Sequence, residues 1–439
     1  MARILHISTR LILGGSQENT VLSCEGQARL GHEVHLAFGP IYGPEGSLLA
    51  RVEAFNARCA EPAVVERVRA VGEAKPVRPV GEPVRPITIH VVPDLVRQVD
   101  PVRDVKCFNQ LGQLIRTIGP DVVHTHSSKA GILGRGAAWG VLARSPAGRM
   151  RVVHTIHGPP FMPVEGGAVR RARVRLSNLI YTHAERYAAE RCHTICSVAD
   201  AMTREFLARG IGRAGQYVTV YSGMETRTFL EPAPGQSREE VRRALGLLPE
   251  AFVIGTVARL AEHKGHDDIL DAIATDLGDR AAWRLLWVGD GWWRERLLGR
   301  LQSMGLGDRV ITTGLVPPDR VPGMMRAMDV LVHPSYREGL PRTVPQALLS
   351  GTPVVAYDVD GTSEACLDPA RVGEENSTGR LVPLGDRAGL RDAIRWMADH
   401  PEERSAMAAR GRAMCADRFS TERMVSHLER VYFGEAVTQ

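Results

Sequence analysis

Residues 252–270 read FVIGTVARLAEHKGHDDIL. The first six residues are apolar and partly β-branched, which is typical of a buried strand. Two cations follow, Arg259 and Lys264, and the residues after Gly265 have the composition of a helix. A strand followed directly by a helix is the repeating unit of a parallel sheet covered by helices. The stretch therefore predicts a parallel α/β sheet.

The same unit recurs along the whole chain. The first half contains the strand-like runs RILHIS (3–8), EVHLAF (33–38), ITIHVV (87–92), DVVHTH (121–126), RVVHTIH (151–157), HTICSV (193–198) and YVTVYS (217–222). The second half adds FVIGTV (252–257), RLLWVG (284–289), RVITTG (309–314), DVLVHP (329–334), PVVAYD (353–358) and GRLVPL (379–384). Because 439 residues exceed one hydrophobic core, we predict two doubly wound, Rossmann-like α/β domains.

The domain limits follow from the last strand of each series. We expect an N-terminal domain at 1–222, a C-terminal domain at 223–417 and a closing helix at 418–439, with Ser420 as its N-cap. Residues 61–86 contain PVRP twice, and their proline density predicts a surface insertion in the first domain.

Composition narrows the class of protein. The net charge of +5 is modest, so we expect no nucleic-acid partner. No run of about 18 apolar residues occurs, and the first residues, MARILHISTR, lack a signal-peptide pattern, so we expect a cytoplasmic protein. The seven cysteines are scattered without metal-type pairs and are read as reduced thiols, Cys192 and Cys196 included.

Charged side chains lie where predicted strands end, which is where ligands bind in open parallel sheets. Arg259 and Lys264 can converge on one pyrophosphate, although each alone would suit a solvated surface. Glu338 precedes a helix expected near Thr343 and can accept hydrogen bonds from sugar hydroxyls or act as a helix cap. In the first domain, Gly14 and Gly15 precede a helix that Ser16 could cap, a turn that suits a phosphate or sugar.

Three histidines end first-domain strands: His124, His126 and His157. A metal site is one interpretation, but no acidic residue is nearby in sequence to complete it. We favour a polar contact made by one of these histidines together with Lys129, and we expect no metal.

With these residues in place, the chain resembles the retaining glycosyltransferases of family 4, the glycosyl transferases group 1. The resemblance is carried, in order, by GGSQENT (14–20), HTHSSKAGILGR (124–135), HTIHG (154–158), YSGMETRTF (221–229), GTVARLAEHKG (255–265), WVGDG (287–291), HPSYREGLP (333–341) and TGRLVPLGD (378–386). It implies the GT-B architecture of two Rossmann-like domains facing across a cleft. It also implies a metal-independent reaction in which a nucleotide-diphosphate sugar is the donor substrate and no cofactor is needed.

The resemblance also implies site roles. Arg259 and Lys264 would bind the donor pyrophosphate, Gly15 would approach the phosphate, and Glu338 would contact donor-sugar hydroxyls. Further implied site residues are His157, beside the transferred sugar, and Leu340, in the donor site. The family's second glutamate is replaced here by Gln346, which leaves an uncharged ribose contact.

The acceptor would be a glycan or a lipid-linked sugar in cell-surface polysaccharide or glycoconjugate assembly. The arginine-rich stretch 169–191 is read either as a solvated helix face or as a peripheral contact with anionic membrane. The acidic triplet at 358–360 is expected to be structural and to lie at the far end of the second domain. The alternatives are a sugar-nucleotide epimerase of the same fold and a non-catalytic nucleotide-sugar-binding protein.

Overall fold

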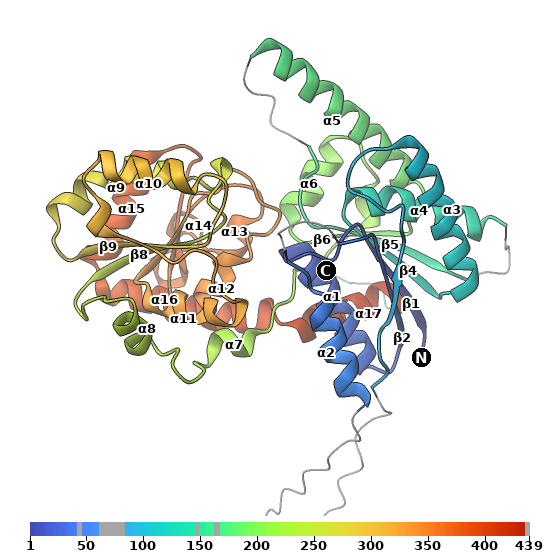
Figure 1. The fold of residues 1–439 in the computed structure, drawn as a ribbon, viewed down its shortest axis with the longest axis horizontal. Helices are drawn as coiled ribbons and strands as arrows, with labels where there is room; N and C mark the ends of the chain where they lie inside the picture. Colours follow the sequence, from blue (N-terminus) through green and yellow to red (C-terminus); the bar gives the residue numbers. More distant parts are fainter. Residues whose placement is uncertain (42–45, 61–83, 145–148, 162–166, 435–439) are drawn as a thin grey trace, which may run out of the picture. The chain divides into compact units, whose positions relative to one another are not determined.

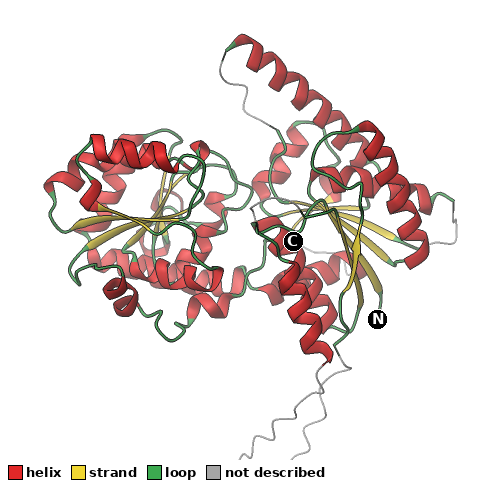
Figure 2. Ribbon diagram, in the orientation of Figure 1, coloured by secondary structure: helices red, strands yellow, loops and turns green. Residues whose placement is uncertain are grey.

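The computed structural model describes residues 1–41, 46–60, 84–144, 149–161 and 167–434. These residues form two compact units. Unit 1 comprises the described residues of Met1–Val198, Thr203–Gly223 and Met424–Gln439, and unit 2 comprises Ala199–Met202 and Met224–Arg423. Each unit holds one sheet with helices on both faces (Figures 1 and 2), which confirms the predicted fold class. The proline-rich insertion expected at 61–86 lies outside the described residues, apart from 84–86.

The sheet of unit 1 is parallel at every described pairing. Its strands are β1 (Arg3–Ser8), β2 (Glu33–Phe38), β3 (Thr88–Val91), β4 (Val122–His126), β5 (Arg151–Ile156), β6 (Thr194–Ser197) and β7 (Tyr217–Thr219). They lie in the order β3-β2-β1-β4-β5-β6-β7. Each strand falls within a predicted run, because β-branched runs of this length suit a sheet buried on both faces.

Helices cover both faces of this sheet. They are α1 (Gly15–Arg29), α2 (Leu49–Ala60), α3 (Pro101–Ile118), α4 (Ser128–Leu142), α5 (Ala168–Ala189), α6 (Asp200–Ala208) and α17 (Thr421–Phe433). Helices α3 and α4 pack on the face that includes Leu5 and Val123, and α1 and α17 pack on the face that includes Ile4 and Val122. The alternation of adjacent residues between the two faces is the period-2 pattern of a strand.

Unit 2 repeats the design with a six-stranded parallel sheet. Its strands are β8 (Phe252–Val257), β9 (Trp283–Val288), β10 (Val310–Thr312), β11 (Val330–His333), β12 (Val354–Tyr357) and β13 (Gly379–Val382), in the order β10-β9-β8-β11-β12-β13. Its helices are α7 (Thr226–Leu230), α8 (Arg238–Ala244), α9 (His266–Asp279), α10 (Arg294–Ser303), α11 (Val321–Ala327), α12 (Thr343–Leu349), α13 (Thr362–Ala365), α14 (Pro369–Val372), α15 (Arg387–Asp399) and α16 (Pro401–Arg418). In Figure 1, α9 and α10 lie on one side of this sheet and α11 and α16 on the other.

The C-terminal helix α17 belongs to unit 1. The Ser420 hydroxyl accepts a hydrogen bond from the backbone N–H of Arg423 at 3.1 Å, so the predicted N-cap is confirmed. Beyond this cap, Met424, Leu428 and Tyr432 are buried in the core that includes Ile4. The chain therefore returns to its first sheet after completing unit 2.

Helix α5 is anchored to unit 1 at its C-terminal end. Glu185 pairs with Arg135 of α4 at 2.6 Å, and both side chains are buried. The Arg135 Nε–H also donates to the carbonyl oxygen of Gly131 at 2.8 Å. Towards its N-terminus α5 becomes exposed and projects from the rest of unit 1 (Figure 1).

Removing one partner of a buried pair leaves the other charge uncompensated. We expect Glu185→Ala to lower the free energy of unfolding of unit 1 by about 3–5 kcal/mol. Glu190→Ala, which removes an exposed carboxylate at the end of the same helix, should cost less than about 1 kcal/mol. Urea unfolding of both variants measures the difference, and equal small losses would contradict an anchoring role for Glu185.

Candidate active site

The candidate site of unit 2 lies where the strand order reverses. Strands β8 and β11 are neighbours, and the chain leaves them for helices on opposite sides of the sheet. Arg259 and Lys264 follow β8, and Glu338 follows β11. The carboxyl ends of such a strand pair form the crevice in which open α/β sheets bind ligands.

The loops after β8 and β11 are bonded to each other. The backbone N–H of Tyr336 donates to the carbonyl oxygen of His263 at 2.9 Å, and the Ser335 hydroxyl donates to the same oxygen at 3.2 Å. Gly265 has φ of 69°, and a Cβ there would lie 2.1 Å from the carbonyl oxygen of Pro334. Glycine is therefore required at the start of α9, because a larger residue would separate the two loops.

Three side chains converge on one oxygen of Glu338. Its Oε1 lies 2.5 Å from Lys264 Nζ, 2.7 Å from the Ser335 hydroxyl and 3.2 Å from His333 Nε2. The structure thus brings together Lys264 and Glu338, which sequence reasoning assigned to different parts of a donor. His333 and Ser335 were not singled out from the sequence. Their position at the end of β11, in HPSYREG, could have indicated them.

Electrostatics keep Glu338 ionised. Burial opposes its charge, but hydrogen bonds and charges from His333 and Lys264 outweigh that cost and hold the pKa of the carboxyl well below its usual range. The carboxylate is therefore a permanent acceptor at neutral pH.

The backbone at Glu338 is fixed by the acidic triplet of the following strand. The Glu338 N–H donates to Asp360 Oδ2 at 2.6 Å, and Asp360 has a φ of 47°, rare for a residue other than glycine. Asp358 pairs with Arg371. The expectation that this triplet lies far from the site was wrong, because β12 adjoins β11 and its loop reaches back to Glu338.

The other predicted donor residues lie on the same unit. Arg259 is exposed, and its guanidinium carbon lies 5.6 Å from the centroid of the Trp292 ring. Leu340 is buried between Glu338 and α12, whose first residue is Thr343, where a helix start was expected. Gln346 lies half-buried on α12.

In unit 1, helix α1 begins at Gly15 with Gly14 as its N-cap. Within the described residues no side chain caps this helix, and the Ser16 hydroxyl instead donates to the Gln17 side chain at 2.8 Å. The capping role expected for Ser16 was wrong. An uncapped helix N-terminus after a glycine pair is the arrangement that binds phosphate oxygens.

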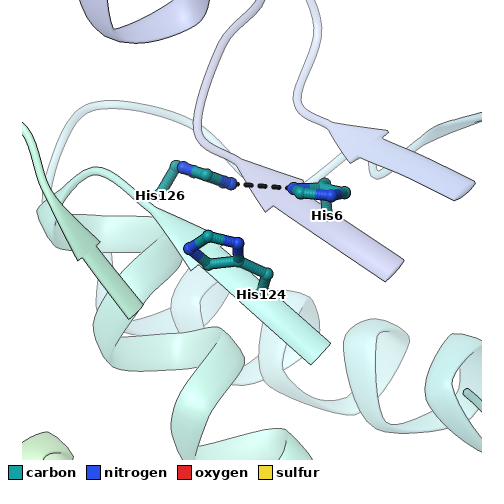
Figure 3. Close-up of side chains that lie close together, drawn as sticks. All are labelled: His6, His124 and His126. Atoms are coloured by element: carbon teal, nitrogen blue, oxygen red, sulfur yellow. Dashed lines mark hydrogen bonds between the residues drawn. The ribbon is translucent and has the colours of Figure 1, made fainter. Parts of the chain in front are cut away.

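The strand-end histidines form one cluster with a residue that sequence reasoning missed. His124 and His126 lie on β4 beside His6 of β1 (Figure 3), and His126 Nδ1 lies 3.1 Å from Nε2 of His157, just past β5. His6 could have been found from its place on β1, because β1 is the strand next to β4. Lys129 does not share this cluster: its Nζ lies 2.6 Å from Asp104 Oδ1 on α3, so the polar contact expected of it was wrong.

The Glu338 carboxyl has a depressed pKa in the folded chain and an ordinary value of 4.5 otherwise. Its ionisation therefore stabilises unit 2 fully above pH 4.5, and this contribution is lost as the pH falls towards the folded value. At pH 3.5 we expect the stability advantage of the wild type over Glu338→Gln to be smaller than at pH 7 by about 1.4 kcal/mol. Urea unfolding followed by tryptophan fluorescence measures this, and a pH-independent difference would contradict the assignment.

Known protein families match both halves of the chain. The family model of glycosyl transferases group 1 matches residues 237–414, and that of glycosyltransferase family 4 matches residues 13–228. The 2-deoxystreptamine N-acetyl-D-glucosaminyltransferase of Streptomyces fradiae is 32% identical over 305 residues, 67% of this chain and 67% of that protein. For the 2-deoxystreptamine glucosyltransferase of Streptomyces kanamyceticus, 32% identical, the match spans 58% of this chain and 65% of that protein.

Solved structures share the fold over almost the whole chain. Anabaena HepE in complex with UDP-glucose has a TM-score of 0.71 at 18% identity, with 98% of this chain and 99% of that chain covered. Sucrose-phosphate synthase from Thermosynechococcus elongatus has a TM-score of 0.73 at 20% identity, with 98% of both chains covered. With both family models matched in order and the fold shared, this chain belongs to the family 4 glycosyltransferases and has their GT-B fold.

Proposed function

We propose that this chain transfers a hexosyl or N-acetylhexosaminyl group from a UDP-sugar to a glycan or lipid-linked acceptor, with retention of anomeric configuration. The observation that carries the proposal is the Lys264–Glu338 pair on the loops after β8 and β11, with Arg259 exposed on the first of these loops. A cation and a fixed acceptor at one crevice match the two ends of a sugar diphosphate.

In this proposal, different side chains of unit 2 bind different parts of the donor. Lys264 has three donors and only one of them is needed for Glu338, so its ammonium can bind a phosphate oxygen while the pair is kept. Arg259 offers a planar fork to a second oxygen. The known contacts of Glu338 converge on Oε1, and we assign its Oε2 to the hydroxyls of the transferred sugar. Leu340 and Gln346 complete the donor site, with Gln346 as a neutral ribose contact.

Unit 1 supplies the remaining groups. We assign Gly15, at the uncapped start of α1, to a phosphate oxygen and His157 to the transferred sugar. The leaving diphosphate accepts the acceptor's proton on the same face, so no carboxylate nucleophile is needed. Catalysis then depends on stabilising the departing diphosphate by fixed cations and N–H groups. The donor is a substrate, and the proposal requires no cofactor.

The names of two relatives refer to a lipid-linked sugar or to lipopolysaccharide. One is the Escherichia coli UDP-Gal:alpha-D-GlcNAc-diphosphoundecaprenol alpha-1,3-galactosyltransferase, 28% identical over 70% of this chain. The other is the lipopolysaccharide core biosynthesis mannosyltransferase LpsB of Rhizobium meliloti, 27% identical over 66% of this chain. These names support a role in cell-surface polysaccharide or glycoconjugate assembly.

Arg259→Ala and Lys264→Ala should each lower transfer by about 10²–10³-fold, the cost of losing one preorganised donor to a developing anion. Both should also weaken UDP binding in isothermal titration. Lys264→Arg should not restore activity, because a planar fork cannot replace a compact ammonium beside Gly265. Arg391→Ala removes an exposed arginine of α15 that pairs with its neighbour Asp392, and it is the matched control. Wild-type activity in either alanine variant would contradict the pyrophosphate assignment.

Helix α5 supports a peripheral contact with anionic membrane. Its exposed apolar side chains include Leu176 and Ile180, which are 59% and 61% exposed and lie four residues apart on one face. Its first half also carries Arg170, Arg171, Arg173 and Arg175 and no acidic residue. An apolar stripe flanked by arginines matches the interface of an anionic bilayer. None of the helices within the described residues is long and apolar enough to span a membrane.

The paired change Leu176→Ser with Ile180→Ser should abolish co-sedimentation with phosphatidylglycerol vesicles, because it removes the side chains that would enter the bilayer. Binding of the wild type should fall as added salt screens the arginines. Val102→Ser with Val105→Ser alters two equally exposed apolar residues on α3 and should have no effect. Binding that survives the α5 change would contradict the assignment.

A further inference from the structure

In unit 2, the loop after β9 is held against the loop after β8. The backbone N–H of Leu260 donates to the carbonyl oxygen of Asp290 at 3.1 Å, and the Trp293 N–H donates to the carbonyl oxygen of Leu260 at 3.1 Å. A Cβ at Gly291 would lie 2.3 Å from that same Leu260 oxygen, so a larger residue there would separate the two loops. The backbone on both sides of Trp292 is therefore fixed beside the end of β8.

Two adjacent tryptophans of this loop have different surroundings. Trp293 is partly buried and packs against the core of unit 2, whereas Trp292 is 67% exposed. An arginine lies over each ring. The guanidinium carbon of Arg296 is 4.2 Å from the centroid of Trp293, and that of Arg259 is 5.6 Å from the centroid of Trp292. Both distances are within the range of about 6 Å of a cation–π interaction, for which tryptophan is the best aromatic partner.

The two arginines differ in what their N–H groups do. Arg296 Nη1 donates to Asp267 Oδ2 at 2.7 Å, so a carboxylate as well as a ring holds this guanidinium. Among the described residues, the Arg259 guanidinium makes no hydrogen bond or ion pair, and its contact is with the Trp292 ring. The Arg296 pair therefore has the contacts of a structural element, and the Arg259 pair does not.

A contact through the ring face restrains an arginine without using its hydrogen-bond donors. The five N–H groups of a guanidinium point outward in its plane, whereas an aromatic ring binds the face of that plane. A carboxylate partner would occupy the N–H fork and would have to be displaced by an incoming anion. A ring partner reduces the rotamer freedom that the arginine loses on binding and leaves the fork available.

We propose that Trp292 is a positioning residue, whose ring face orients the Arg259 guanidinium at the end of β8 and leaves its N–H fork available to a diphosphate. The diphosphate contact rests on the proposed function, whereas the pairing of the two side chains does not. Direct stacking of Trp292 on the nucleobase of the donor is the competing role, because an exposed ring can also bind the face of a base. The guanidinium already over the ring favours the positioning role.

The pairing can be tested on the full chain without any donor. After labelling with ¹³C,¹⁵N-arginine, the side-chain signals of Arg259 are identified by their loss in Arg259→Ala. In the wild type, the ring current of Trp292 should shift the Hδ and Nε–H signals of Arg259. Trp292→Leu keeps an apolar side chain without a ring and should abolish the shift. Trp292→Phe keeps a ring face and should retain part of it.

Isothermal titration with UDP and with inorganic pyrophosphate tests the role of the pair. Trp292→Leu should weaken the binding of both ligands by the same factor, about two- to fivefold, as expected for an exposed cation–π interaction. Trp292→Phe should restore part of this loss. In Arg259→Ala, adding Trp292→Leu should cause no further loss, because both changes remove one interaction.

Tyr187→Ala is the matched control. Tyr187 is a half-exposed ring on α5 of unit 1, and the guanidinium carbon of Arg191 lies 3.6 Å from its centroid. The change removes an arginine–aromatic pair of the same kind from the other unit. Both ligands should therefore bind this variant as they bind the wild type.

The outcomes separate the pair from its role. Arg259 signals that are unshifted in the wild type, or unchanged in Trp292→Leu, would overturn the pairing. A loss for UDP with none for pyrophosphate would assign Trp292 to the nucleobase and overturn the positioning role. Unchanged or tighter binding of both ligands, or a further loss in the Arg259→Ala background, would overturn it too. If neither ligand binds the wild type and no sugar is transferred, the proposed function and the diphosphate role fail together, and the spectra still decide whether Trp292 orients Arg259.

Discussion

Parallel strand pairing is the constraint on which both units depend. It places the carboxyl ends of all strands in a sheet along one edge, and at the β8–β11 and β1–β4 pairs the chain leaves neighbouring strands for opposite faces. In unit 2 this brings Lys264 next to Glu338, which are 74 residues apart in the chain. In unit 1 it brings His6 to His126 across 120 residues. The candidate site residues are therefore brought together by the strand order, and each loop has only to supply one or two of them.

The Lys264–Glu338 pair shows how a buried carboxylate can stay ionised. Burying an ionised carboxylate costs several kcal/mol unless it is paired and fully hydrogen-bonded. Glu338 is compensated at one oxygen, Oε1, by the Lys264 ammonium and the Ser335 hydroxyl, with His333 Nε2 3.2 Å away, and Asp360 fixes its backbone. If Lys264 binds the donor diphosphate as proposed, its pairing with Glu338 already orients the ammonium, so less side-chain entropy is lost on binding.

The sequence predicted the strands and the strand-end residues well, because β-branched runs and the turns after them are local features. The expected contacts of Ser16 and Lys129 were wrong, since a hydroxyl or ammonium can reach several partners and only the packed structure selects Gln17 or Asp104. His6 was missed, and Asp360 was expected far from the site, for a different reason. Their contacts depend on which strands become neighbours, and strand order is set by how helices pack on each face.

The histidine cluster in unit 1, made of His6, His124, His126 and His157, also constrains how its residues can vary. Each buried imidazole satisfies two hydrogen bonds, so replacing one of them leaves its neighbours with unmet donors or acceptors, each costing about 1–3 kcal/mol. An apolar residue at position 126 would leave His6 Nδ1 without its partner, whereas an amide would satisfy part of the network. The same coupling makes the cluster costly to alter at any one position, because a change at one ring alters the donors and acceptors available to the next.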